Sequence, residues 1–338
     1  MKLPDRIADD LDRAVRLERW TLAWLASIIV VIGLTMGSSQ AMRTAWVEDV
    51  LGLVPAIVFL LAARYERRPP TRRFPYGFTR VNSLSFLVAA TALTAVGGYL
   101  IVDATLKLVQ AEHPTIGPVH IFGEQVWLGW LMVAALAYSV VPPFILGRMK
   151  LPLARRLQDK VLHTDALMLK AEWMTGLAGA AGVLGVGFGL WWADAVAAAT
   201  ISLAILKDGV TALRVATAEL VDGTPRELGG SGIAEDARVL ENSLVSRFPG
   251  CDVRLRETGR YIAAQIVGDE PPRTLETSQL WPGEAEREWR LAEVSFASRS
   301  QPDTGSETRS TGMPSAAPSS AAPAEGMPDP RTDDAQVS

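Results

Sequence analysis

Six long apolar stretches between residues 20 and 214 constrain this chain more than any other feature. They run over residues 20–35, 44–63, 82–106, 126–147, 164–190 and 191–213. Most of them reach the roughly 20 residues that a helix needs to cross the hydrocarbon core of a bilayer. The sequence therefore predicts an α-helical membrane protein whose transmembrane domain, residues 20–214, contains six transmembrane helices.

The basic residues predict the orientation of these helices. They gather in the N-terminal arm (1–19) and in the loops after the second and fourth stretches, whereas the loops on the other side offer little beyond Arg43 and Lys107. The positive-inside rule then places both termini in the cytoplasm. This rule also explains the arginine-rich loops without a nucleic-acid partner. Short loops and the lack of a recognisable signal favour a bacterial-type inner membrane.

The pattern changes after Asp222. Apolar residues follow a helical spacing over residues 233–248, and two alternating strands over 251–257 and 260–268 flank a Thr258-Gly259 turn. A weaker helix around 282–291 leads to a last strand near 292–297. The order α-β-β-α-β predicts a small ferredoxin-like α+β domain in the cytoplasm, over residues 220–298.

Residues 299–338 contain almost no large apolar side chain. Such a segment cannot bury enough surface to offset the entropy lost on ordering, so we expect a disordered tail.

Carboxylates inside the apolar stretches point to the function. Glu48 and Asp49 lie in the second stretch, and Asp165 and Glu172 lie in the fifth. A carboxylate is costly in hydrocarbon, so this group suggests a polar site for a cation or a proton. Asp165 and Glu172 share one face of a helix with Met168, because their spacings are three and four residues.

The residue types bias the choice of ion. The chain has one cysteine, Cys251, and none of its three histidines lies in the middle of a stretch, so a cysteine-rich or imidazole-based zinc site is not expected. An oxygen-dominated site suits manganese, iron(II) or magnesium better than zinc, although the thioether of Met168 modestly favours a softer ion. We expect the ion as substrate, with no permanently bound cofactor.

Each candidate also has a purely structural interpretation. Glu48 and Asp49 could extend toward Arg43 or water, and Glu172 could pair with Lys207 in the sixth stretch. Met168 could simply fill the core, and Asp165 could cap the start of a helix. His113 and His120, in the outer loop, are plain loop residues or a weak collecting site.

Several motifs are similar to those of the cation diffusion facilitators, over about residues 18–298. The loop at 64–80 resembles the family's loop between spans two and three, with Pro75-Tyr76-Gly77 and Arg80 matching. Phe74 and Phe78 stand where that loop has histidines, and Asn82 stands where a glutamate is typical. Further similar segments are Asp165-Ala166-Leu167, Trp192-Ala193-Asp194, Leu220-Val221-Asp222 and the hairpin from Arg254 to Ile262.

The resemblance implies export of a divalent metal coupled to proton entry by alternating access, in a homodimer. It also implies a central site built from two residues four apart on the second span and two four apart on the fifth. These places are Glu48 and Gly52, and Met168 and Glu172. Asp194 is then a proton-relay or entrance group.

Three function classes follow. The first is a proton-coupled divalent cation exporter. The second is a transport-incompetent relative that acts as a membrane scaffold or regulator, because Gly52, Met168, Phe74 and Phe78 occupy places where the family has polar groups. The third, an intramembrane enzyme, is disfavoured because no nucleophile with a nearby base appears in the stretches.

Overall fold

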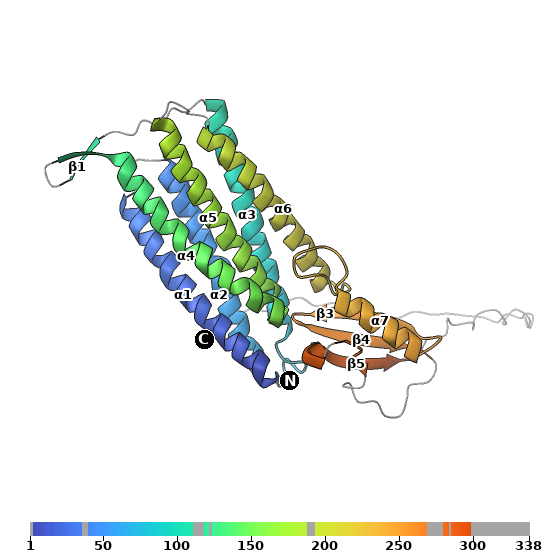
Figure 1. Cartoon of the computed structure of the whole chain (residues 1–338). Coiled ribbons are helices and arrows are strands. Elements are labelled where there is room, and N and C mark those ends of the chain that lie inside the picture. Colours follow the sequence, from blue (N-terminus) through green and yellow to red (C-terminus); the bar gives the residue numbers. More distant parts are fainter. Residues whose placement is uncertain are drawn as a thin grey trace, which may run out of the picture. The chain divides into compact units, whose positions relative to one another are not determined.

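Long α-helices make up most of the chain (Figure 1). The computed structural model describes residues 3–35, 40–110, 118–121, 124–187, 193–268, 280–283 and 285–298. Within these ranges six helices of 27 residues or more cover the predicted apolar stretches. They are α1 (Asp5–Thr35), α2 (Gln40–Glu66), α3 (Arg80–Gln110), α4 (Leu128–Leu157), α5 (Lys160–Gly187) and α6 (Ala193–Leu220).

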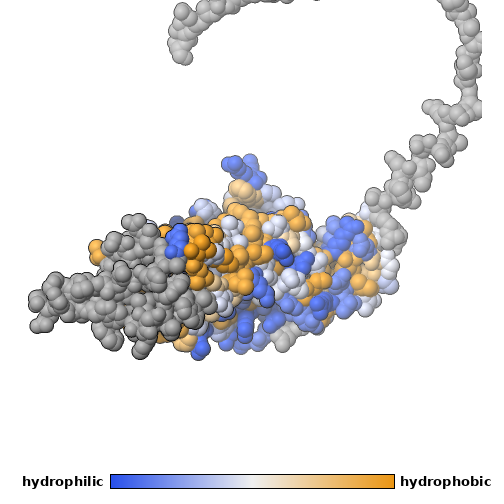
Figure 2. Space-filling view, turned by 90° about the horizontal axis from the view of Figure 1, so that it is seen from above, coloured by the Kyte–Doolittle hydropathy of each residue, from blue (hydrophilic) through white to orange (hydrophobic). Residues whose placement is uncertain are grey.

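The surface of these helices is that of an integral membrane protein. In the part of the chain that the structure describes, three segments are long and apolar enough to cross a bilayer, namely Asp5–Leu34, Trp46–Glu66 and Arg80–Gln110. Large apolar side chains such as Leu34, Val102 and Leu203 are exposed on them and on α6, and apolar residues form broad patches on the face shown in Figure 2. A complete set of six membrane crossings stays a prediction.

Glycines set how closely some of the helices approach. A Cβ atom at Gly97 of α3 would lie 2.7 Å from the backbone of Leu206, and one at Gly209 of α6 would lie 2.8 Å from the backbone of Thr94. The two backbones therefore touch at places where a larger residue would not fit. On α5, Gly176 lies in the same way against the side chain of Val140 of α4.

The small C-terminal region has the predicted order of elements. Helix α7 (Glu235–Arg247) is followed by β3 (Asp252–Thr258), β4 (Tyr261–Val267) and β5 (Leu291–Ala297), with strand order β3-β4-β5. β3 and β4 pair antiparallel, and β4 and β5 pair parallel. The weaker helix is a single short 3-10 segment, η2 (Ala285–Arg290). The apolar face of α7 packs on the sheet through Leu240 and Leu244.

One further hairpin was not predicted. Strands β1 (Pro118–Ile121) and β2 (Glu124–Trp127) pair antiparallel, so that α4 begins at Leu128 and not at residue 126. Strands of four residues are too short for an alternating pattern to stand out beside a long apolar run. Figure 1 shows this hairpin at the end of the helices away from β3, β4 and β5. The predicted tail, 299–338, lies outside the described residues.

The turn between β3 and β4 docks against the helices. The backbone N–H of Gly259 donates a hydrogen bond to Ser83 Oγ of α3 at 2.8 Å. Gly259 has φ +63°, and a Cβ there would lie 2.8 Å from the carbonyl oxygen of Thr79. A glycine meets both requirements, since it tolerates positive φ and leaves room for the approach.

The next residue, Arg260, is fully buried beneath this turn. Its Nη2 lies 2.6 Å from Asp159 Oδ2, just before α5, and 3.2 Å from Glu66 Oε2 at the end of α2. Asn82 of α3 also donates to Asp159, at 3.1 Å. The buried guanidinium thus joins the hairpin to the ends of α2 and α5, and Asn82 adds α3 through Asp159.

Two further residues, Tyr261 and Lys160, extend this ionic network, which we call the hairpin network. Tyr261 donates a hydrogen bond to Glu66 Oε1 at 3.0 Å, and burial, followed by the charge of Glu66, raises the pKa of its hydroxyl, which keeps the proton in place. Lys160, at the start of α5, pairs with Glu257 of β3 and with Glu219 of α6. The sheet is therefore bound to α2, α3, α5 and α6.

Replacing Arg260 with Ala should lower the stability of the protein by about 3–5 kcal/mol, because Glu66 and Asp159 would stay buried without their cation. Thermal unfolding in detergent and limited proteolysis between residues 221 and 234 would measure this loss. Arg254→Ala is the matched control, since Arg254 pairs with Asp252 on the exposed side of the same hairpin and should cost less than about 1 kcal/mol. Equal effects of the two substitutions would contradict the interpretation.

Candidate metal site

Three carboxylates are buried together between α2 and α5. The relative exposures are 5% for Glu48, 8% for Asp49 and 7% for Glu172. The charges of Asp49 and Glu48 both act on Glu172, so the three groups lie within electrostatic range of one another. We call these three residues the acidic cluster.

Three of the six carboxylate oxygens of the acidic cluster are buried without a hydrogen-bond donor among the described residues. Thr175 Oγ1, one turn after Glu172 on α5, lies 3.0 Å from Glu48 Oε1 and can donate to it. Among the described residues, Asp49 Oδ2 and both carboxylate oxygens of Glu172 are buried without a partner. Buried polar atoms are almost always satisfied in folded proteins, so this group has the capacity to hold a cation or protons.

Gly52 contributes free space beside the acidic cluster and no side-chain ligand. The carboxylate of Glu172 occupies the volume that a Cβ at position 52 would fill, and Glu172 Cδ is 3.2 Å from that point. The side chain of α5 thus reaches the surface of α2.

The burial of the cluster bears on the structural interpretations of its residues. Glu48 and Asp49 are turned into the protein and not toward its surface. Lys207 is exposed, and no hydrogen bond within the described part of the chain joins it to Glu172. Met168 is buried in an apolar group that includes Leu93 and Ile205. Its surroundings are those of a core residue.

Asp165 belongs to a different group, which we call the lysine triad. Lys150 of α4 pairs with Asp165 and, at 2.8 Å, with Glu18 of α1, and all three side chains are buried. One oxygen of each carboxylate has no further partner among the described residues. Asp165 still acts on Glu172 through its charge, but its ion pair is with Lys150.

Two of the remaining predicted residues, Asp194 and His120, lie in described elements. Asp194 is in the first turn of α6 and His120 is in β1, but their side chains lie outside what the structure describes, as does all of His113. The sequence analysis missed Asp103 of α3, whose charge acts on Glu48. A carboxylate within the third apolar stretch was the signal that could have revealed it.

The acidic cluster is not a closed coordination sphere. In the described ranges, no group of three or more His, Cys, Asp or Glu side chains is arranged to hold a metal ion. Binding of an ion by all three carboxylates therefore requires a shift of side chains or helices.

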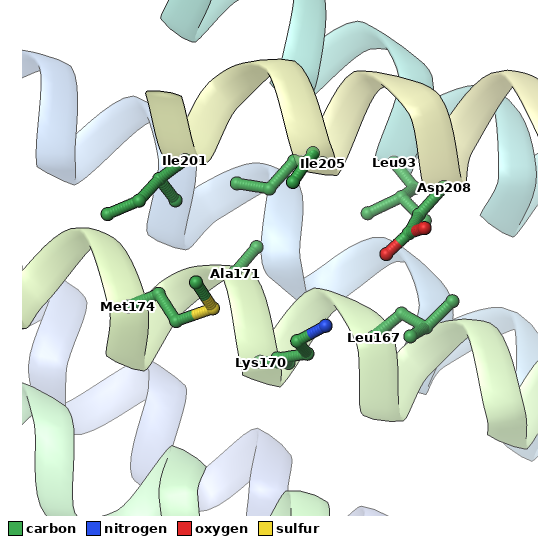
Figure 3. A pocket seen from close by; sticks show the side chains of 9 residues that line it. Leu93, Leu167, Lys170, Ala171, Met174, Ile201, Ile205 and Asp208 are labelled. Carbon is green, nitrogen blue, oxygen red and sulfur yellow. The ribbon is translucent and has the colours of Figure 1, made fainter. Parts of the chain in front are cut away.

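A small pocket between α3, α5 and α6 is a separate feature (Figure 3). Its lining is apolar except for Lys170 and Asp208, which point toward each other across it. The cavity measures about 20 Å³, which is room for one water molecule. This size and the presence of a lysine do not suit a divalent cation.

Comparison with known proteins identifies the family. Residues 20–221 match the model of the cation efflux transmembrane domain. The chain belongs to the cation efflux family. Its described helices and its small C-terminal sheet fit that family's arrangement of a transmembrane domain and a small domain.

Several members of the cation efflux family are similar to the chain over most of its length. A protein of Mycobacterium tuberculosis named a probable cation efflux system protein is 27% identical over 77% of this chain and 73% of its own length. The manganese efflux system protein MneS of Bacillus subtilis is 23% identical over 72% and 78%. The zinc transporter ZitB of Escherichia coli is 25% identical over 75% and 72%.

Replacing Lys150 with Met should lower the stability of this cation efflux protein by about 3 kcal/mol or more, because Glu18 and Asp165 would stay buried without a counter-ion. The matched control is Lys170→Met on α5, whose exposed side chain should contribute within about 0.5 kcal/mol. Thermal unfolding of the purified proteins in detergent would measure both. A Lys150→Met protein as stable as the control would show that the lysine triad does not hold α1, α4 and α5 together.

Proposed function

We propose that this protein exports a divalent metal cation from the cytoplasm and binds it at Glu48, Asp49 and Glu172. The observation that carries the proposal is the burial of three carboxylates, with unpartnered oxygens, between two helices of a membrane protein. An uncompensated carboxylate is expensive in such a place, and a cation would compensate it. Membership of a family of transporters supports this function and gives no support to an enzyme.

The ligands favour a hard ion. The cluster offers carboxylate oxygens and the hydroxyl of Thr175, which suit manganese, iron(II) or magnesium better than zinc. Met168 packs in an apolar group, so its thioether adds little to the affinity for a soft ion. The names of the relatives include both a manganese and a zinc transporter, so their names do not decide between the two ions.

The proposed mechanism is alternating access with proton antiport. Carboxylates bind either a metal ion or a proton, because both use the same oxygen lone pairs. The cluster would take up the ion while open to the cytoplasm and release it when protons enter from the other side. Asp194 is a candidate relay for these protons, and Asp165 contributes negative charge nearby. Six crossings, cytoplasmic termini and a homodimer formed through the β-sheet complete the proposal.

A specific observation favours the second candidate, a relative that does not transport and acts as a scaffold or regulator. In the loop between α2 and α3, the rings of Phe74 and Phe78 pack in a tilted arrangement with centroids 5.0 Å apart, and the ring of Tyr65, near the end of α2, packs on Phe78 at 6.2 Å. An aromatic group of this kind offers no metal ligand near the cytoplasmic ends of the helices. Flux measurements distinguish the two candidates.

In proteoliposomes with a pH gradient, the wild-type protein should move at least one of manganese, iron(II), magnesium, cobalt and zinc. Glu48→Gln, Asp49→Asn and Glu172→Gln should each lower that flux by about tenfold or more, because each amide removes a charged ligand. Asp208→Asn is the matched control, since Asp208 lies in the separate pocket of Figure 3, and its flux should stay near the wild-type value. No flux of any ion through folded, correctly oriented protein would favour the scaffold.

Binding of the ion should weaken as the pH falls, because protons then occupy the same carboxylates. Thermal unfolding at several manganese concentrations and pH values would show this effect. An ion present at 100 times its dissociation constant should add about 2.7 kcal/mol of stability at high pH, and the gain should shrink at low pH. A gain that does not depend on pH would contradict proton competition.

A further inference from the structure

Gly52 and Glu172 fit together as a notch and a side chain. Gly52 lies one helical turn after Glu48, on the same face of α2, and its missing side chain leaves a hollow that faces α5. The carboxylate of Glu172 fills this hollow, with Cδ 3.2 Å from the place of the absent Cβ. We propose that Gly52 determines the ion specificity of the acidic cluster by letting the Glu172 carboxylate take a ligand place on α2. This inference rests on the proposed function.

The length of Glu172 is part of this fit. An aspartate at position 172 would end one carbon–carbon bond, about 1.5 Å, earlier. Its carboxylate would then withdraw from α2 toward α5. With Glu172, all three carboxylates of the cluster reach the surface of one helix, since Glu48 and Asp49 already belong to α2.

No hydrogen bond among the described residues explains the position of the Glu172 carboxylate. Both of its oxygens are buried without a hydrogen-bond partner among the described residues, and its relative exposure is 7%. Steric space at Gly52 is therefore the feature that admits the carboxylate here. A hard cation, bound mainly by oxygen ligands, is the substrate class that suits this arrangement.

Helix propensity and the proposed fit of Glu172 beside Gly52 predict opposite effects of Gly52→Ala on the stability of the protein. Alanine is a better helix former than glycine, so Gly52→Ala should stabilise α2 if the space beside Gly52 had no role. If the notch holds Glu172, the added methyl group instead displaces a buried carboxylate. The sign of the change in stability therefore tests the inference.

The experiment is a double-mutant cycle of Gly52→Ala and Glu172→Asp, measured by thermal unfolding without metal and by binding of manganese and of the other ions of the flux assay. Gly98→Ala on α3 is the matched control, because a Cβ there meets nothing within 4 Å. We expect Gly52→Ala to lower the melting temperature by about 4 °C or more and manganese affinity by about tenfold or more. Adding Glu172→Asp, which shortens the side chain, should restore the melting temperature of the Gly52→Ala protein but not its affinity.

Each outcome of the cycle has a separate meaning. A Gly52→Ala protein that melts no lower than the Gly98→Ala protein and binds manganese like wild type would overturn the inference that the space beside Gly52 positions Glu172. Should Gly52→Ala fail to fold, recovery of folded protein by the added Glu172→Asp substitution would support the notch, and no recovery would overturn it. The two positions could be coupled in stability while the protein binds none of the tested ions. This result would support the steric fit of Glu172 beside Gly52, but it would overturn both the role of Gly52 in specificity and the proposed function.

Discussion

Burial of charge inside an apolar helix bundle is the constraint on which the rest of this structure depends. A charged side chain without water must be compensated by a partner, and removing one member of a buried pair is costly. The described residues meet this constraint differently in different places. Arg260, Lys160 and Lys150 are each bound by two carboxylates, whereas three of the six carboxylate oxygens of the acidic cluster have no hydrogen-bond partner among the described residues. The first kind of site fixes the fold, and the second kind leaves capacity for a ligand.

The two kinds of site are linked by the helices that carry them. Glu66, which binds Arg260, ends α2, the helix that carries Glu48 and Asp49. Lys160, which binds Glu257 of the sheet, begins α5, the helix that carries Glu172. The hairpin network therefore holds the ends of the same two helices between which the ion is proposed to bind. Any change in the angle between α2 and α5 must therefore either break these contacts or use them as its pivot.

The sequence predicted the elements well and their contacts poorly. Apolar runs and alternating patterns are local signals, so the long helices and the order of β3, β4 and β5 could be read directly. The lysine triad could not, because Glu18, Lys150 and Asp165 come from three helices and look like ordinary charges at the ends of apolar stretches. The same holds for Arg260, which resembles a turn residue in sequence and is fully buried in the structure. Short strands such as β1 and β2 were missed because four residues carry too little pattern.

The acidic cluster shows why counting ligands by position can mislead. By position, Gly52 is a missing ligand and Met168 is a soft one, which together describe a damaged site. In the structure, the glycine provides the space that the longer Glu172 occupies, and the methionine belongs to the apolar packing of α5. A ligand place is a region of space between two helices, and either helix can supply the atom that fills it. The loss of a side chain on α2 can therefore be offset by the length of a side chain on α5, which no pattern within one helix reveals.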